Sequence, residues 1–367
     1  MRISAPESRT ARYWTLTIIL LTALSSAQEV PGKPEANSAL QIAELEKRAQ
    51  AGDANAQFAL GQAYDFGNGI PQNEQQACLW YRKSAEQGYP PAQNSLGLMY
   101  RSGRGVEPNK EQAVSWYRKA AKQGNAKAMF NLGTAYYNGD GVTTDDSAAY
   151  AWFLLAREAG SDPAREALNR MEGSLKSWQL SAALESVGDF YEQGNDLPQD
   201  RKRAIEWYRK AALLGEPTVC VKLAKDLIDS GEPQAYPEAL ERCEQAGKQM
   251  YSPGAVCAGL LYQRGLGTSQ DLEHAAKWFT RAAELGNAQG MLQLGQMYWS
   301  GSGVKQNKIS AYAFMLLAST ANLPDALRDK SSYEQALSSK ELEKARKQAD
   351  AWARQHPVTR IILPPSR

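Results

Sequence analysis

Apolar and small residues recur along this chain in a repeating pattern that has the spacing of helices. The segment Ala-Gln-Phe-Ala-Leu-Gly-Gln-Ala-Tyr at residues 56–64 returns in closely similar form at 92–100 and 128–136, with a period of about 36 residues. Leu60 and Tyr64 lie one turn apart on a single helical face, as do their counterparts. A period in this range predicts stacked helical repeats.

Each copy is followed by a Gly-x-Gly turn and a second helical segment. Because these turns follow helices rather than strands, we expect helix C-caps with positive φ and not phosphate-binding loops. The turns are Gly67-Asn68-Gly69, Gly103-Arg104-Gly105, Gly139-Asp140-Gly141, Gly265-Leu266-Gly267 and Gly301-Ser302-Gly303. Equivalent residues suited to N-caps precede the second helices: Asn73, Asn109, Asp145, Asp200, Asp271 and Asn307.

A glycine recurs in the middle of the first helices, where it costs about 1 kcal/mol relative to alanine. This recurrence predicts close contact with an aromatic ring of a neighbouring helix. The glycines are Gly61, Gly97, Gly133, Gly188, Gly259 and Gly295. The aromatic pairs of the second helices repeat equally strictly, which favours a buried core over a carbohydrate-binding surface. These pairs are Trp80-Tyr81, Trp116-Tyr117, Trp152-Phe153, Trp207-Tyr208 and Trp278-Phe279.

The predicted fold is therefore all-α, a solenoid of about seven antiparallel helix pairs. Two longer units interrupt the pattern, Asp162–Trp178 in the middle and Asp325–Trp352 near the end, and both have the character of caps. We expect a linker at 28–40, a first repeat block with its cap-like unit at 41–178, and a second block with a C-terminal cap at 179–355. A tail follows at 356–367.

The N-terminal residues have the pattern of a cleaved secretory signal. Three arginines precede the apolar run at 14–24, and Ser25-Ser26-Ala27 offers small residues for cleavage near Ala27. An uncleaved anchor is the alternative, although the run is short for a bilayer span. Cleavage would change the net charge of +2 to zero. The prediction is a periplasmic or secreted protein without membrane insertion or a basic stripe for nucleic acid.

The four cysteines provide poor material for a metal site, because no Cys-x-x-Cys occurs and the chain has only 2 histidines. In an oxidising compartment, one disulfide can form among Cys220, Cys243 and Cys257. Cys220 and Cys257 compete for Cys243, and the sequence leaves the pairing open. Cys78 has apolar neighbours, which favours a buried packing thiol.

The sequence predicts no catalytic residues, cofactor or metal. His274 lies within a second helix, His356 lies beside the tail, and the acidic residues are scattered beside Lys and Arg. The motifs Gly-x-Ser-x-Gly and His-Glu-x-x-His are absent from the sequence.

A binding surface has better support, because the first helices carry a stripe of residues that varies between repeats while the packing positions stay constant. First helices of a solenoid line its concave face, so we expect this stripe to bind a protein or peptide partner. Some of its members could instead pack against the long loops. The stripe comprises Asn55, Phe58, Gln62 and Asp65, then Asn94, Leu98 and Arg101, then Phe130, Thr134 and Tyr137, and finally Leu292, Gln296 and Trp299.

The phrase Ala-x-Ala-Gln-x-x-Leu-Gly-x-x-Tyr-x-x-Gly-x-Gly-Val, followed by Ala-x-x-Trp-Tyr-x-Lys-Ala-Ala-x-x-Gly, resembles the Sel-1-like repeat, a relative of the tetratricopeptide repeat. The resemblance covers residues 45–355 and is weakest at 215–255. It implies a right-handed superhelix that acts as a scaffold or adaptor in bacterial envelope assembly or signalling. Cysteine-rich members imply an alternative, a periplasmic protein that binds a cell-wall ligand or slowly hydrolyses β-lactams.

Overall fold

The computed structural model describes residues 36–356, so the predicted signal peptide and nearly all of the tail lie outside the described residues. Contacts divide the chain into unit 1, residues 1–204, and unit 2, residues 205–367. The helices before the boundary are α2 (Ala36–Gln50), α3 (Ala54–Phe66), α4 (Glu74–Glu86), α5 (Pro90–Ser102), α6 (Lys110–Lys122), α7 (Ala126–Asn138), α8 (Asp146–Glu158), α9 (Asp162–Glu172) and α10 (Ser177–Gln193). Helix α11 (Arg201–Ala212) contains the boundary.

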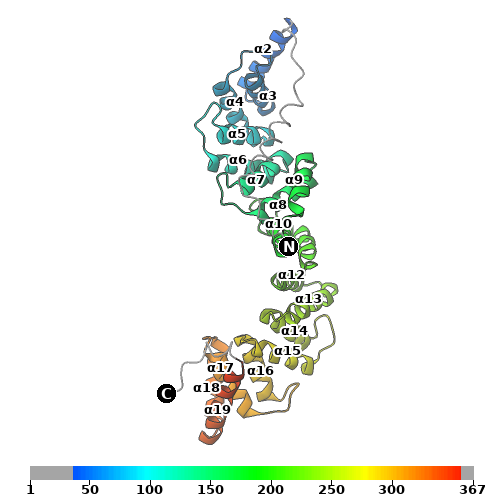
Figure 1. Cartoon of the computed structure of the whole chain (residues 1–367), viewed down its shortest axis with the longest axis vertical. Helices are drawn as coiled ribbons and strands as arrows, with labels where there is room; N and C mark the ends of the chain where they lie inside the picture. The colour runs from blue at the N-terminus through cyan, green and yellow to red at the C-terminus, as the bar shows by residue number, and fades with distance from the viewer. Residues whose placement is uncertain (1–35, 357–367) are drawn as a thin grey trace, which may run out of the picture. The chain divides into compact units, whose positions relative to one another are not determined.

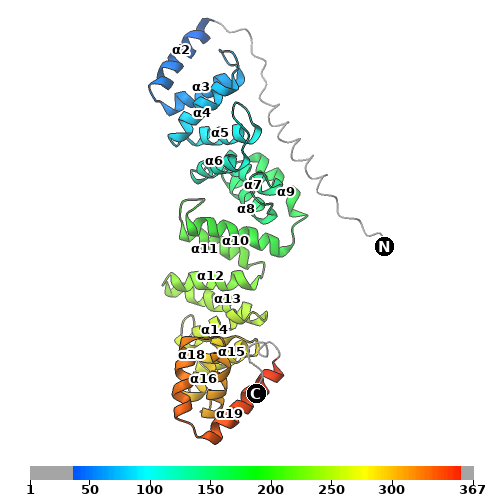
Figure 2. The ribbon, with the colours of Figure 1, turned by 90° about the vertical axis from the view of Figure 1, so that its left-hand side faces the viewer.

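Unit 2 continues with helices and one short 3-10 turn, η1. These elements are α12 (Pro217–Asp229), η1 (Pro233–Ala235), α13 (Tyr236–Lys248), α14 (Ser252–Arg264), α15 (Leu272–Glu284), α16 (Ala288–Ser300), α17 (Lys308–Ser319), α18 (Pro324–Gln335) and α19 (Ser339–Gln355). The helices are coloured along the chain in Figure 1, and Figure 2 gives a second view.

Consecutive helices pack in pairs, as the sequence predicts. In unit 1 the pairs are α3 with α4, α5 with α6, and α7 with α8; in unit 2 they are α12 with α13, α14 with α15, and α16 with α17. The described residues contain helices and no strand, so the all-α repeat fold is confirmed. Helix α10 packs on α8, and α18 and α19 pack on α17. The block boundary at 178/179 stays a prediction from the repeat spacing.

The predicted caps are confirmed. The side chains of Asn73, Asn109, Asp145, Asp271 and Asn307 each accept a hydrogen bond from a backbone N–H in the first turn of the following helix. Asp200 accepts one from the Arg203 N–H at 3.1 Å. Each first glycine of the five Gly-x-Gly turns is a left-handed C-cap.

The second glycine of these turns has a packing role that sequence reasoning missed. A Cβ at Gly105 would collide with the carbonyl of Glu74, at the start of the preceding second helix, and a Cβ at Gly303 would collide with that of Leu272. The turns at Gly105, Gly141, Gly267 and Gly303 therefore lie against the backbone of the repeat before them.

The mid-helix glycines meet rings of the second helix of their own pair. A Cβ added at Gly97 would lie 2.5 Å from the Tyr117 ring, and one at Gly133 would lie 2.6 Å from the Phe153 ring. Gly61 faces Tyr81 and Gly259 faces Phe279 in the same way, whereas Gly295 faces Met315. The predicted close contact is confirmed for these glycines, with a methionine in place of the ring in the last pair.

The aromatic pairs of the second helices are only partly core. Their second members, Tyr81, Tyr117, Phe153, Tyr208 and Phe279, are buried, and so are Trp152 and Trp207. Trp80, Trp116 and Trp278 are half-buried, which corrects their predicted burial. Lysine ammonium groups lie 4.0 Å from the ring centroid of Trp80 and 3.9 Å from that of Trp116. These rings cover the outer edge of the core and carry a cation–π contact.

The disulfide joins Cys243 of α13 to Cys257 of α14, with Cα atoms 5.5 Å apart. Of the two candidate partners of Cys243, the structure selects Cys257, and Cys220 is a buried free cysteine, as is Cys78. Counted from the helix starts, Cys243 and Cys257 occupy the positions of Tyr81 and Ser95 in the first repeats. Ala224 stands at the glycine position of α12. Where the ring is replaced by a cysteine, the facing residue is no longer glycine.

We expect Gly97→Ala to lower the free energy of unfolding by about 2 kcal/mol, because the added methyl group overpacks the contact with Tyr117. Gly173→Ala is the matched control, since Gly173 has an ordinary helical φ and no atom lies within 4 Å of the position that its new methyl group would take. That change should be neutral or stabilising by up to about 1 kcal/mol. Urea unfolding followed by circular dichroism measures both, and equal effects would contradict the glycine–ring contact.

Candidate partner-binding surface

The stripe residues of unit 1 form what we call the first-helix surface: Asn55, Phe58, Gln62, Asp65, Asn94, Leu98, Arg101, Phe130, Thr134 and Tyr137, on α3, α5 and α7. They differ in exposure. Asn55 is exposed, whereas Asp65, Asn94 and Thr134 are buried. The other six are half-buried, so a partner can reach these six side chains and Asn55.

The buried polar members bind neighbouring parts of the protein. Asn94 accepts a hydrogen bond of 2.8 Å from the side-chain amide of Asn131, on the next first helix. The Thr134 hydroxyl donates to the Phe130 carbonyl at 3.0 Å. The first of these bonds joins two successive first helices, and the second lies within α7. Both satisfy buried polar groups, which are costly to leave without a hydrogen bond.

Two aromatic members, Phe58 and Phe130, each contact a buried ring of a second helix. Phe58 lies 5.6 Å from Tyr81 and 5.4 Å from Tyr89 between ring centroids. Phe130 lies 5.4 Å from the ring of Phe153. One side of each ring is therefore fixed by the core, and its orientation is set before any partner arrives.

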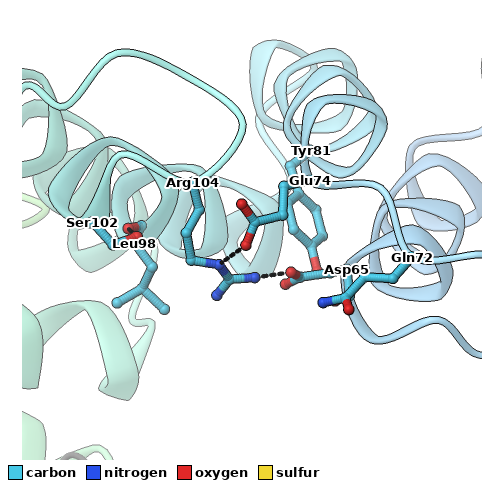
Figure 3. A network of polar contacts seen from close by, with 7 residues as sticks. All are labelled: Asp65, Gln72, Glu74, Tyr81, Leu98, Ser102 and Arg104. Carbon is cyan, nitrogen blue, oxygen red and sulfur yellow. Dashed lines mark hydrogen bonds and ion pairs between the residues drawn. The ribbon is translucent and has the colours of Figure 1, made fainter.

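A polar network joins the first two repeats at the end of α3, as Figure 3 shows. The Tyr81 hydroxyl donates to the Asp65 carboxylate at 3.2 Å, and Arg104 from the following turn contacts the same carboxylate. Arg104 also donates to Glu74 at 2.9 Å. Burial raises the pKa of Tyr81, so its hydroxyl remains a donor. Asp65 is thus a buried charge with two partners.

The corresponding positions of the next repeat carry the opposite charges. Arg101 stands where Asp65 was, Asp140 where Arg104 was, and Lys110 where Glu74 was. Asp140 accepts a hydrogen bond of 2.7 Å from the Lys110 ammonium group. The Tyr117 hydroxyl is buried and has no hydrogen-bond partner among residues 36–356. Burial raises the pKa of Tyr117, while the nearby positive charge of Arg101 lowers it.

In unit 2 the stripe lies against the C-terminal helices. Gln296 donates to the Asp329 carboxylate at 2.7 Å, and Trp299 stacks on Tyr333 with ring centroids 3.8 Å apart. Both partners belong to α18, and Leu292 is buried. Helix α18 occupies the place that a further first helix would take, so it covers part of the stripe of the last repeat. The sequence pattern could not predict that α18 covers these residues.

The described residues offer little material for catalysis. No group of three or more His, Cys, Asp or Glu side chains within them could hold a metal ion. Burial raises the pKa of the Cys78 and Cys220 thiols, which keeps them protonated at neutral pH. The His274 ring is exposed and lies 2.6 Å from the carboxylate of Asp271, which caps the same helix. Within residues 36–356, no helix has the length and apolar character that a membrane crossing requires.

Paired helices, glycine–ring contacts and capped Gly-x-Gly turns define an α/α repeat protein. The Sel1 repeat pattern matches residues 54–89, 90–125, 126–161, 181–216, 257–287 and 288–323. Because these segments make up more than half of the sequence, the chain belongs to the Sel1 repeat family. Residues 217–256, where Ala224 and Cys243 replace glycine and ring, fall outside the matched segments.

The chain is also similar to parts of larger proteins. Chitin synthase regulator SKT5 of Saccharomyces cerevisiae is 28% identical over 101 residues, which are 26% of this chain and 14% of that protein. Its counterpart in Malassezia restricta is 30% identical over 145 residues, 38% of this chain and 10% of that protein. An uncharacterized protein of Neisseria meningitidis is 31% identical over 125 residues, 33% of this chain and 25% of that protein. The chain spans a quarter or less of each.

Two solved structures are similar over most of the chain. A protective antigen of uropathogenic Escherichia coli, with an SLR fold, is 23% identical and covers 89% of this chain and 98% of its own, with a TM-score of 0.34. A Sel1 repeat protein from Oxalobacter formigenes is 25% identical and covers 85% of this chain and 99% of its own, with a TM-score of 0.36.

We expect Asp65→Ala to lower the free energy of unfolding by about 2–3 kcal/mol, because it removes the acceptor of the buried Tyr81 hydroxyl and the partner of Arg104. Lys110→Gln breaks the equivalent, more exposed ion pair and should cost about 0.5 kcal/mol or less. Thermal or urea unfolding measures both. A loss for Asp65→Ala as small as that for Lys110→Gln would show that the network contributes little to stability.

Proposed function

We propose that this protein is an exported, non-catalytic scaffold that binds a protein or peptide partner on the first-helix surface of unit 1. The proposal rests on one observation. The side chains that vary between repeats are half-buried, and the helices that carry them are held in place by buried hydrogen bonds. A preformed surface loses less conformational entropy when it binds. Repeat proteins of this architecture usually act through such extended surfaces.

The proposed process is envelope assembly or signalling. Two of the similar proteins are named as regulators of an enzyme, which is in keeping with a role exerted on another protein. The disulfide between Cys243 and Cys257 supports an oxidising compartment, and the N-terminal sequence supports export to the periplasm or beyond.

The partner test begins with a photo-crosslinking amino acid in place of Gln62, in the mature protein 28–367, to capture and identify the bound envelope protein. The affinity of the identified partner is then measured for Gln62→Ala, Leu98→Ala and Tyr137→Ala combined. We expect a loss of about tenfold or more, since contacts of this kind often dominate binding energy.

The matched control combines Gln75→Ala, Leu79→Ala and Glu86→Ala, three exposed residues of α4 outside the first-helix surface. It should change the affinity less than about twofold, because such residues are outside the contact. Equal losses in both variants, or a surface variant that binds normally, would reject this location. Absence of any crosslinked partner would favour the cell-wall-ligand alternative.

Export and the disulfide are tested together on protein purified from the native compartment. N-terminal sequencing should begin after Ala27. Alkylation of the unfolded, unreduced protein should label Cys78 and Cys220 and spare Cys243 and Cys257. An intact N-terminus or four labelled cysteines would contradict the proposed location.

A further inference from the structure

The helices that carry the first-helix surface, α3, α5 and α7, have an unbalanced charge. Asp65 is the one carboxylate in α3, α5 and α7, and it is buried and paired with Arg104. Arg101 at the end of α5 and Lys127 near the start of α7 are the two cations. Neither makes a hydrogen bond or an ion pair within residues 36–356. The reachable charge on this surface is therefore positive.

The two equivalent networks show what is missing beside Arg101. In the first repeat, one carboxylate accepts hydrogen bonds from a buried tyrosine hydroxyl and from a guanidinium group. In the second repeat, the tyrosine hydroxyl and a guanidinium group are both present, on Tyr117 and Arg101, but the local carboxylate of Asp140 is engaged by Lys110. Tyr117 is only 1% exposed, and a buried hydroxyl without a partner costs stability.

We propose that the partner carries an acidic segment, and that one Asp or Glu side chain of this segment binds Arg101, the half-buried cation at the position that corresponds to Asp65. Lys127, which is exposed, attracts the remaining negative charge of the segment. This inference rests on the proposed function, because it names the chemistry of the partner of the same surface. A guanidinium–carboxylate contact gives both charge and geometric specificity.

The test uses a phage library of random twelve-residue peptides, selected on the mature protein 28–367. We expect selected peptides to be enriched in Asp and Glu, and their binding to weaken with rising salt. The selected peptides are then synthesised with blocked termini. Their C-terminal carboxylate therefore cannot supply the negative charge that binds the protein. Arg101→Gln should weaken the binding of such a peptide about tenfold. Lys83→Gln on the outer side of α4 is the control and should change it less than about twofold.

A double-mutant cycle locates the contact. Replacing the acidic residue of the peptide by Gln should weaken binding to the native protein about as much as Arg101→Gln does, and should have little further effect on the Arg101→Gln variant. Additive losses would place the acidic residue elsewhere and overturn the assignment to Arg101.

A variant with exchanged charges distinguishes a loss of peptide binding from a loss of folding. Arg101→Asp, Lys110→Glu and Asp140→Arg together copy the first repeat, so the Tyr117 hydroxyl gains an internal acceptor and the site is closed. This variant should unfold at the same temperature as the native protein or higher, and should lose acidic peptides. If this variant still binds acidic peptides, the proposal is wrong.

The library selection distinguishes the further inference from the proposed function. If the selected peptides bind this surface without a preference for Asp and Glu, the inference fails while the proposed function stands. If no peptide binds this surface, both fail.

Discussion

The contact between a ring on the second helix and a glycine in the middle of the first helix is the constraint on which the repeats depend. Because a Cβ at Gly61, Gly97, Gly133 or Gly259 would lie 2.5 to 2.6 Å from ring atoms, the two helices of each pair are as close as their backbones allow. A constant distance within each pair gives every repeat the same geometry. The residues between the packing positions are then free to differ, which is what a binding surface requires.

The repeat that contains Cys243 lacks the glycine–ring contact, and a different contact takes its place. Cys243 replaces the ring and Ala224 replaces the glycine, so that a small side chain faces a small one. The contact that aromatic packing would supply is replaced by a covalent bond to Cys257 on the next first helix. In the first repeats the equivalent positions hold Tyr81 and Ser95. The disulfide thus stands at a junction between successive repeats that other repeats join by weaker forces.

Local features could be predicted from the sequence, and features that depend on the neighbouring repeat could not. The caps at Asn73 and Asn307 and the left-handed glycines follow from a few adjacent residues. The stripe was predicted as one set, but Asn94 is buried because Asn131 of the next repeat lies on it, and Trp299 is covered by α18. The pairing of Cys243 with Cys257 rather than Cys220 also depends on distances between repeats, and so does the unpaired Tyr117 hydroxyl. A repeating sequence pattern does not give these distances.

The two ion pairs between turns and helices have a consequence for how the chain finds its correct order during folding. Arg104 pairs with Glu74, whereas Asp140, one repeat later, pairs with Lys110. Nearly identical repeats risk docking on the wrong neighbour, a known failure of repeat proteins. If the second of these turns docked one repeat too early, Asp140 would face Glu74, and if the first docked one repeat too late, Arg104 would face Lys110. Either mistake would bring like charges together. The opposite polarity of the two ion pairs therefore favours docking of each turn on its correct neighbouring repeat.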